Sequence, residues 1–282
     1  MRVLIDEGLA AALVAHCFPA WAHLPIRAVL PGGHDNRTFR LGDDLAIRLP
    51  SAQGYAAAVE KEQRWLPKLA PQLPLPIPAP VAAGRPIAGY PWAWSVNRWL
   101  TGEPATIASI DDVRFARDLA AFLNDLRAAD ATGGPVAGAH SFFRGGDLAV
   151  YGAEARDAIA ALGDRALAVW AAALLDRALE SRWSAPAVWV HGDIAVGNLL
   201  VQDRRLASVI DFGSSAVGDP ACDLVIAWTR FDPDTAAAFR GEVGLDDDTW
   251  ARAAGWALWK ALITPDQPGS PATLARLQED LI

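Results

Sequence analysis

Hydrophobic and polar residues alternate with two different periods along the chain, and these periods divide it into strands and helices. Short apolar runs, which predict β-strands, occupy residues 187–190, 199–201 and 206–210. Polar residues 202–205 separate the last two runs by a loop of hairpin length. We therefore predict a β-hairpin here, with its two far ends side by side.

The first hundred residues mix both periods. Residues 38–41 and the alternating run 45–49 flank a turn at 42–44, so they predict strand, turn and strand. A helical period follows over residues 56–69, and residues 90–100 are apolar and β-like. The N-terminal part should therefore combine a sheet with a helix.

The remainder of the chain is predominantly helical in pattern. After a turn at 101–104, Ser109 precedes Asp111 and Asp112 at the expected start of an amphipathic helix. Residues 148–179 are rich in alanine and predict further helix. We expect an α+β fold, with the strands concentrated in the N-terminal part.

Composition limits the class of protein. A hydrophobic fraction of 52% over 282 residues can fill the core of one large domain or of two lobes. No run of about 18 uncharged apolar residues occurs, and Asp6 and Glu7 lie close to the N-terminus, so we expect neither a membrane span nor a signal peptide. Cys17 and Cys222 are far apart and have apolar neighbours, which favours buried thiols in a cytoplasmic protein.

The charge balance narrows the choice of partners. A net charge of −8 argues against binding to nucleic acid. An acidic surface attracts cationic small molecules. We therefore expect small-molecule ligands, with no nucleic-acid or membrane partner; the sequence leaves the oligomeric state open.

Three polar residues around the predicted hairpin suggest a reaction class. Asp193 precedes the hairpin, Asn198 begins its first strand and Asp211 follows its second strand, so Asn198 and Asp211 are expected to meet. Mg²⁺ takes hard oxygen ligands, often one or two from protein with phosphate and water completing the set. An acid for the proton of an acceptor, with an amide and a second acid for the metal, is the minimum set for phosphoryl transfer.

The ordered motif resembles the aminoglycoside phosphotransferase family, whose fold is that of the protein kinases. It comprises His191-Gly192-Asp193, Asn198, Asp211-Phe212-Gly213, Gly218-Asp219-Pro220 and Asp223. The resemblance implies a bilobal fold, with a mixed N-terminal lobe over residues 1–100, a hinge at about 97–103 and a helical C-terminal lobe over 104–282. It also implies that Asp193 is the catalytic base and that Asn198 and Asp211 are magnesium ligands, with ATP or GTP as co-substrate.

The family also needs a loop, a cation and an acid to hold the nucleotide phosphates. Gly32 and Gly33 lie in a loop whose backbone amides are candidates for phosphate contact. The only lysines of the chain, Lys61, Lys68 and Lys260, do not occupy the expected strand. We predict that Arg48 replaces the lysine, although Arg and Lys are not equivalent and a solvated strand arginine is the alternative.

The acid partner of Arg48 and the hinge complete the predicted nucleotide site. Glu60 and Glu62 are two positions apart on the predicted helix and therefore lie on different faces, so only one of them can point inward. The resemblance of residues 61–66 to the helix of the family favours Glu62, and Glu60 is the second choice. By resemblance, the hinge that contacts the base is Asn97, Arg98, Trp99 and Leu100, with a plain core strand as the alternative.

Three further residues of the motif have supporting roles in our interpretation. His191 is expected to hold the loop backbone, and Asp223 to brace the catalytic loop. Asp219 fits a turn or a helix start. In the family, acidic residues of the C-terminal lobe hold the amino groups of the acceptor. The candidates, each more often a solvated helix end, are Asp232, Asp234, Glu242, Asp246, Asp247, Asp248, Glu279 and Asp280.

We therefore predict a kinase that transfers the γ-phosphoryl group of ATP or GTP to a hydroxyl group of an aminoglycoside-like, cationic antibiotic. A metabolic kinase of a sugar, amino alcohol or amino acid, and a nucleotide-binding module without catalysis, are the alternatives. Protein kinase activity is disfavoured, since only about ten residues separate Gly213 from Asp223, too few for a long activation loop.

Overall fold

The computed structural model of the chain describes residues 3–87, 89–106, 110 and 112–280. It divides into two compact units. The first unit contains Met1–Thr101 and Ser208–Gly213, and the second contains Gly102–Ala207 and Ser214–Ile282. Residues 208–213 thus belong with the N-terminal part of the chain, although they lie within the range that the sequence analysis assigned to the C-terminal lobe.

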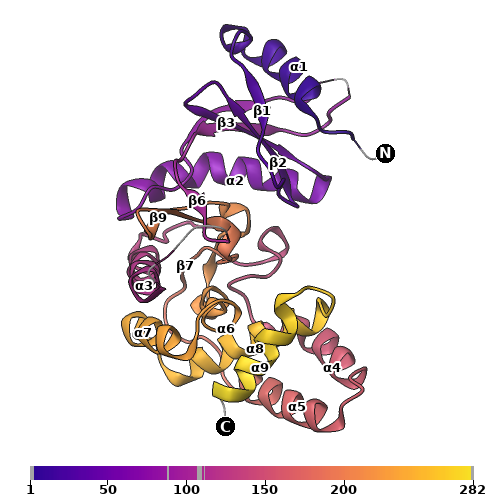
Figure 1. Ribbon diagram of the computed structural model, residues 1–282, viewed down its shortest axis with the longest axis vertical. Helices are drawn as coiled ribbons and strands as arrows, with labels where there is room; N and C mark the ends of the chain where they lie inside the picture. Colours follow the sequence, from indigo (N-terminus) through magenta and orange to yellow (C-terminus); the bar gives the residue numbers. More distant parts are fainter. Residues whose placement is uncertain (1–2, 88, 107–109, 111, 281–282) are drawn as a thin grey trace. The chain divides into compact units, whose positions relative to one another are not determined.

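The first unit is built on an antiparallel five-stranded sheet in the order β1-β2-β3-β5-β4. Helix α1 (Glu7–Cys17) and helix α2 (Gln53–Leu69) lie on opposite sides of it (Figure 1). The strands are β1 (Ile26–Ala28), β2 (Asn36–Leu41), β3 (Leu45–Pro50), β4 (Pro80–Gly84) and β5 (Trp94–Arg98).

The two faces of this sheet differ in chemistry. Leu45, Ile47 and Leu49 of β3 are buried in the apolar cluster that includes Leu13 and Val14 of α1. Side chains alternate along a strand, so the residues between them face the opposite side, where α2 packs. The polar face of the sheet is therefore the one that carries Arg48.

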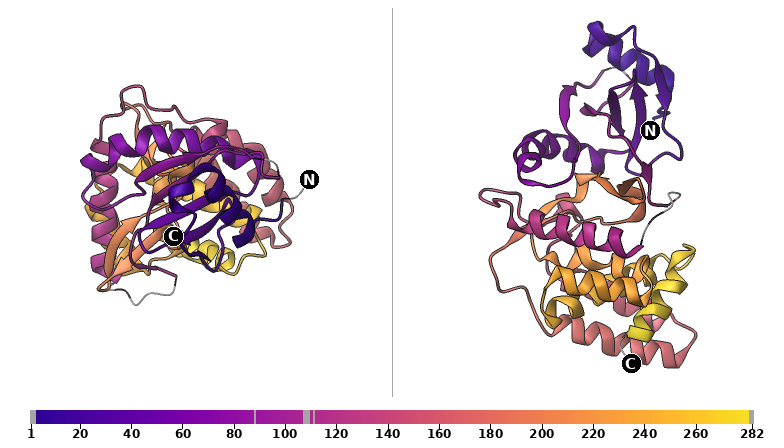
Figure 2. Two further views of the ribbon diagram at one scale, coloured as in Figure 1. Left: turned by 90° about the horizontal axis from the view of Figure 1, so that it is seen from above. Right: turned by 60° about the vertical axis from the view of Figure 1, so that its left-hand side comes forward.

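The second unit is mainly helical. Helix α3 (Asp112–Ala128) packs against α7 (Pro233–Val243), and α8 (Asp247–Ile263) packs against both α5 (Arg165–Leu179) and α9 (Gly269–Asp280) (Figure 2). The remaining helices are α4 (Gly152–Ala160) and α6 (Ile226–Thr229).

Residues 148–179 are largely helical, as expected, and are divided between α4 and α5. Asp164 caps the N-terminus of α5 by accepting hydrogen bonds from the amides of Ala166 and Leu167. Ser109 and Asp111, predicted at the start of α3, lie outside the described residues.

The predicted hairpin is confirmed. It consists of β8 (Leu199–Gln202) and β9 (Arg205–Val209), joined by Asp203 and Arg204, which both have positive φ as in a two-residue type I′ turn. Strand β6 (Glu103–Pro104) pairs with β8, and β7 (Val188–Val190) pairs with β10 (Ala216–Gly218). The residues of the polar motif lie within or close to these short strands.

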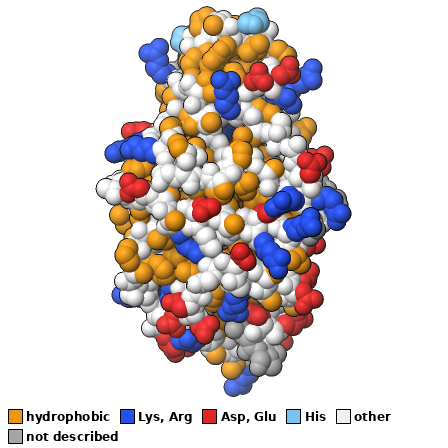
Figure 3. All heavy atoms as spheres, turned by 90° about the vertical axis from the view of Figure 1, so that its left-hand side faces the viewer, with side chains coloured by type: hydrophobic (Ala, Val, Ile, Leu, Met, Phe, Trp, Pro, Cys, Tyr) orange, Lys and Arg blue, Asp and Glu red, His pale blue; other side chains and the backbone are white. Residues whose placement is uncertain are grey.

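The predicted fold class is confirmed by a sheet-rich N-terminal part and a helical C-terminal part. None of the described helices has both the length and the apolar character needed to cross a membrane. The face shown in Figure 3 exposes hydrophobic, basic and acidic side chains, and several of its basic side chains lie close together at the right of the view.

Candidate active site

Arg48 is the centre of an ion-pair network in the first unit. Its Nη1 donates to both carboxylate oxygens of Glu62, at 2.9 and 3.1 Å, and its Nη2 donates to Oδ1 of Asp211 at 2.5 Å. Only 11% of the Arg48 side chain and 5% of the Glu62 side chain are exposed. The structure thus joins Arg48 to Glu62 and leaves Glu60, the second choice, exposed on the helix.

The electrostatics of this network favour a permanently charged Arg48. Burial lowers the pKa of Arg48, but the nearby carboxylates of Glu62 and Asp211 outweigh that effect and raise it above its ordinary value. A planar guanidinium can bind two carboxylates at once through separate nitrogens, which an ammonium does less well. Arginine in the place of the usual lysine therefore allows contact with Glu62 and Asp211 at the same time.

Within the first unit, hydrogen bonds tie the segment 208–213 to the N-terminal part of the chain. Besides the Arg48–Asp211 pair, Lys61 donates to the carbonyl of Gly213 at 2.7 Å, and the amide of Val209 donates to the carbonyl of Pro76 at 3.2 Å. Asp211 itself has φ 67°, in the left-handed region that non-glycine residues enter at a cost. These attachments hold the Asp211 carboxylate on the Arg48 face of the sheet.

Lys61 is a component of this network that the sequence analysis did not identify. Burial lowers its pKa to about 8, against the opposing effects of Glu62 and Asp211. Its position next to Glu62 on α2, in a chain with only three lysines, is the sequence signal that would have drawn attention to it.

In the second unit, Asp223 holds the backbone of the His191–Asp193 loop. Its two carboxylate oxygens accept hydrogen bonds from the amides of His191 and Gly192, each at 2.7 Å, and its side chain is buried. Burial raises the pKa of Asp223, while His191 and the two backbone amides oppose that rise. Gly192 has φ 82°, and an added Cβ would overlap the carbonyl of Ser214, so the loop requires glycine there.

Asp193 is the exposed end of this buried loop. Its amide donates to Nδ1 of His191 at 3.2 Å, and its Oδ2 accepts a hydrogen bond from Nδ2 of Asn198 at 2.9 Å. The same Nδ2 also donates to the backbone carbonyl of Asp193 at 3.0 Å. The loop therefore exposes the Asp193 carboxylate to solvent, while the side chain of Asp223 fixes the loop backbone.

The donor set suits a magnesium ion. Asn198 uses its amide nitrogen toward Asp193, so its carbonyl oxygen Oδ1 is the atom left to act as a hard ligand. Asp211 offers a carboxylate, of which Arg48 binds one oxygen. Among the described residues, no group of three or more His, Cys, Asp or Glu side chains is arranged to hold a metal. That Asn198 and Asp211 share one ion stays a prediction.

The other predicted nucleotide contacts lie in the first unit. Gly32 and Gly33 are exposed in the loop between β1 and β2, where the carbonyl of Gly33 accepts from Arg37. At the end of β5 the amides of Arg98 and Trp99 donate to the carbonyls of Ala79 and Asp44, and the ring of Trp99 stacks under Arg40. Leu100 follows them, half-buried, and Asn97 is buried within β5.

Asp219 is a structural anchor in the second unit. It accepts a hydrogen bond from the amide of Ala221, as the expected helix start requires, and it forms a buried ion pair with Arg252 at 2.7 Å. Its backbone amide donates to the carbonyl of Gly145 at 2.7 Å. The loop around residue 145 is thereby tied to the segment that leads to Asp223.

That loop also projects two aromatic side chains that the sequence analysis did not single out. Phe142 and Phe143 have φ of 50° and 54°, yet 42% and 38% of their surfaces are exposed. Tyr151 donates to the carbonyl of Phe142 at 3.0 Å, and the buried hydroxyl of Ser141 donates to the carbonyl of Arg144 at 3.1 Å. Two consecutive bulky residues in this conformation are an outlier of the kind that accompanies binding sites.

Several of the acidic candidates for the acceptor site have structural partners. Asp232 and Asp246 cap α7 and α8 by accepting from the amides of Thr235 and Thr249. The amide of Thr235 lowers the pKa of Asp232, and the side chain and then the amide of Thr249 lower the pKa of Asp246. Asp248 pairs with Arg177, and Asp280 accepts from the indole of Trp228. The expectation that most of them are helix ends agrees with this geometry.

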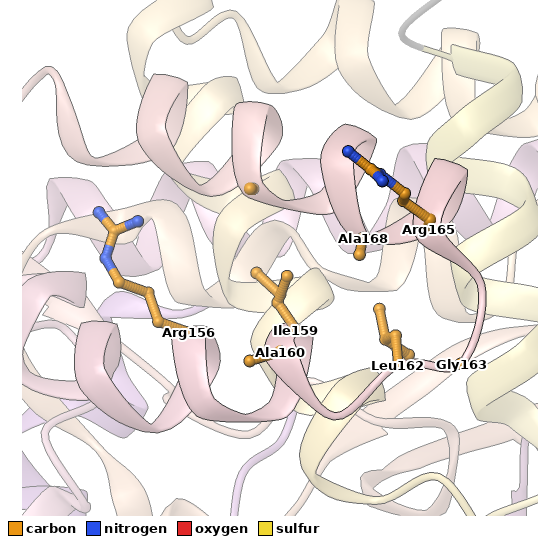
Figure 4. Close-up of a pocket in the computed structure, with 8 residues that line it drawn as sticks. Arg156, Ile159, Ala160, Leu162, Gly163, Arg165 and Ala168 are labelled. Carbon is orange, nitrogen blue, oxygen red and sulfur yellow. The ribbon is translucent and has the colours of Figure 1, made fainter.

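A cavity of about 410 Å³ lies between α4 and α5 (Figure 4). Arg156 and Arg165 stand at its margins, and Ile159 and Ala168 line its apolar interior. None of the residues predicted to act in catalysis lines this cavity.

Solved structures with the same fold include phosphotransferases of two antibiotic classes. The GDP complex of aminoglycoside 2'-phosphotransferase-IIIa is 20% identical with a TM-score of 0.77, and 98% of each chain is covered. The GDP and kanamycin complex of APH(2")-IIIa is also 20% identical, with a TM-score of 0.75 over 97% of this chain and 98% of that one. Macrolide 2'-phosphotransferase MphH from Brachybacterium faecium is 24% identical, with a TM-score of 0.60 over 96% and 98% of the two chains.

A search of curated protein sequences gave no match. The model of the phosphotransferase enzyme family, APH, matches residues 27–256, which include both the Arg48 network and the Asp193 loop. This match confirms the predicted enzyme class, a phosphotransferase, and the resemblance inferred from the motif. The chain therefore belongs to the phosphotransferase enzyme family.

Proposed function

We propose that this protein transfers the γ-phosphoryl group of ATP or GTP to a hydroxyl group of a small molecule, with an aminoglycoside-like antibiotic as the acceptor. The observation that carries the proposal is the Asp193 loop. An exposed carboxylate stands on a backbone that Asp223 fixes with two hydrogen bonds of 2.7 Å. Such a rigid base is what acceptor activation requires, since catalysis of this transfer consists chiefly of positioning.

In the proposed reaction, Asp193 orients the acceptor hydroxyl and takes its proton. The acceptor oxygen forms a bond to the γ-phosphorus, the bond from that phosphorus to the β–γ bridging oxygen breaks, and the nucleoside diphosphate leaves. The hydrogen bond from Nδ2 of Asn198 to Oδ2 of Asp193 fixes the orientation of the carboxylate. Magnesium, held by Asn198 and Asp211, would neutralise charge on the phosphate oxygens.

Arg48 is the proposed phosphate cation. Its guanidinium is already oriented by Glu62, so little conformational entropy is lost when it binds an oxygen of the nucleotide. Gly32 and Gly33 supply exposed backbone to cover the phosphates, and residues 97–100 supply the hinge.

Two observations bear on the identity of the acceptor. The structural neighbours include complexes with kanamycin, streptomycin and gentamicin, and also macrolide phosphotransferases, which supports an antibiotic acceptor. The exposed Phe142 and Phe143 lie on the loop tied to Asp219, which favours an acceptor with an apolar face in addition to its hydroxyl groups. A metabolic kinase of a sugar, amino alcohol or amino acid remains the alternative enzyme.

A nucleotide-binding module without catalysis is the alternative from another class. The arginine in the lysine position motivates it, whereas the intact Asp193, Asn198 and Asp211 count against it. We place the reaction in the cytoplasm, where both nucleotides are available.

A nucleoside diphosphate release assay with Mg²⁺ tests the proposal. ATP and GTP are each offered with panels of aminoglycosides, macrolides, amino alcohols and sugars, and Asp193→Ala serves as the inactive control. We expect release that depends on an acceptor and vanishes in the variant. Nucleotide binding without stimulation by any acceptor would instead support the non-catalytic module.

A further inference from the structure

Asn97 carries a buried side-chain amide that has no hydrogen-bond partner among the described residues. Only 3% of the residue is exposed, and neither Oδ1 nor Nδ2 has a hydrogen-bond partner in the part of the chain that the structure describes. An asparagine amide can donate two hydrogen bonds and accept two. Buried polar groups normally have partners, so both ends of this amide call for an explanation.

The strand register shows which face of the sheet Asn97 occupies. Across the β3–β5 pair, Asn97 stands opposite Ala46, and Ser95 stands opposite Arg48. Residues opposite each other in antiparallel strands point to the same side. The intervening Val96 belongs to the apolar cluster under α1. Asn97 therefore lies on the polar face with Arg48, about 7 Å further along the strand than Ser95.

The neighbour of Asn97 across the strand pair is small, and the backbone that follows Asn97 is held in place. Ala46, its cross-strand partner, has only a methyl side chain. The backbone that follows Asn97 is fixed, because the amides of Arg98 and Trp99 both donate to carbonyls of the same unit. The amide thus sits at a rigid position on β5. Its cross-strand neighbour Ala46 is two residues from Arg48, the proposed phosphate cation, on β3.

An unpaired buried amide destabilises a folded protein, and a ligand that forms hydrogen bonds with the amide would remove this cost. We propose that the side-chain amide of Asn97 binds the edge of the purine base at its 6-position and N1. This inference rests on the proposed nucleotide-dependent function and assigns to a side chain a contact beyond those of the hinge backbone.

The chemistry of an amide matches both purines. Adenine offers a donor at the 6-amino group and an acceptor at N1, whereas guanine offers an acceptor at O6 and a donor at N1. Rotation about the last bond of the asparagine side chain exchanges its oxygen and nitrogen. One residue can therefore pair with either base, and we expect the protein to bind ATP and GTP with affinities within about tenfold of each other.

The test measures nucleotide binding by calorimetry in the absence of acceptor, with wild type, Asn97→Leu and Ser95→Ala. The ligands are ATP, GTP and purine riboside triphosphate, which lacks the 6-amino group of ATP. Wild type should bind ATP about five- to tenfold more tightly than the purine analogue, because one hydrogen bond is lost. In Asn97→Leu that ratio should approach one, and the affinities for ATP and GTP should both fall.

Ser95→Ala is the matched control. It also removes a buried oxygen that has no partner among the described residues, and it lies on the same face of β5. We expect both variants to unfold at a temperature no lower than wild type, because each loses an unpaired buried polar group. Ser95→Ala should keep the wild-type preference for ATP over the purine analogue.

The outcomes separate the inference from the function on which it rests. An unchanged preference for ATP over the analogue in a folded Asn97→Leu variant would overturn the role of the Asn97 side chain. Absence of nucleotide binding in wild type would overturn the proposed function as well. A marked loss of thermal stability in Asn97→Leu would show that the amide is paired within the protein, which also contradicts the inference.

Discussion

Arg48 and Asp211 are 163 positions apart in sequence, yet Nη2 of the first lies 2.5 Å from Oδ1 of the second. This ion pair, with the bond from Lys61 to Gly213, fastens the Asp-Phe-Gly segment to the unit formed by the N-terminal hundred residues. The proposed phosphate cation and one proposed magnesium ligand thus belong to one compact unit. A change at Arg48 should therefore affect stability as well as nucleotide binding.

We expect Arg48→Ala to lower the free energy of unfolding by about 3–5 kcal/mol, because it leaves the carboxylate of Glu62 buried without its partner. Urea denaturation of both proteins would measure the difference. The matched control is Arg156→Ala, which removes an ion pair with Asp176 of similar length, 2.8 Å, but with both side chains more than half exposed. That variant should lose about 1 kcal/mol or less. Equal losses in the two variants would contradict the account of the Arg48 network.

The role of Asp223 leads to a different expectation. Asp223→Asn keeps the size of the side chain but replaces one acceptor oxygen with a donor that faces a backbone amide. We expect kcat to fall by about tenfold or more as the Asp193 loop loses its fixed position. KM for the nucleotide should stay near the wild-type value. Steady-state kinetics with varied nucleotide separates the two parameters, and a change in KM alone would show that Asp223 acts elsewhere.

The sequence predicted the local features of this site better than its long-range ones. Asp193, Asn198 and the hairpin lie within the single stretch 193–209, where turn chemistry and spacing fix the geometry. The choice of Glu62 over Glu60 needed only the helical period together with family spacing. These features depend on contacts between near neighbours.

Other features could not be predicted, because they depend on contacts that only the folded chain makes. The orphaned amide of Asn97 results from the pairing of β3 with β5, which brings together residues about fifty positions apart. The positive φ of Phe142 and Phe143 contradicts the local preference of phenylalanine and is maintained by bonds from Ser141 and Tyr151. Neither composition nor periodicity carries a signal for such positions.

The base role of Asp193 predicts a separation of binding from turnover. In Asp193→Ala, we expect phosphoryl transfer to fall by at least about a hundredfold, while the dissociation constant for nucleotide changes less than about threefold. Calorimetry and the release assay give the two quantities. Asp157→Ala, which removes an exposed carboxylate from α4, should alter neither. Activity retained in Asp193→Ala together with weakened nucleotide binding would exclude the base role.

Lys61 should react with amine reagents at an unusually low pH. Its pKa is lowered by burial to about 8, so the neutral, nucleophilic amine forms as the pH rises through about 8 rather than through the usual range of lysine. Acetylation followed by peptide mass spectrometry, from pH 6 to 11, would give the midpoint for Lys61. We expect a midpoint near 8. A midpoint for Lys61 within the usual range of lysine would contradict the buried environment assigned to it.

Phe143 tests whether backbone strain is maintained for acceptor binding. Glycine adopts positive φ readily, so Phe143→Gly should relieve about 1 kcal/mol of strain, which offsets part of the packing lost with a side chain that is 38% exposed. We expect stability within about 1 kcal/mol of wild type, because the two effects oppose each other. The KM for the acceptor should nevertheless rise by about tenfold, since an exposed aromatic side chain is lost from the loop that is tied to Asp219. The control is Val150→Ala, which removes an exposed apolar side chain of similar accessibility outside the proposed contact. Val169→Gly is less suitable, because Val169 lies within α5. An acceptor KM that rises equally in Phe143→Gly and Val150→Ala would place the acceptor elsewhere on this unit.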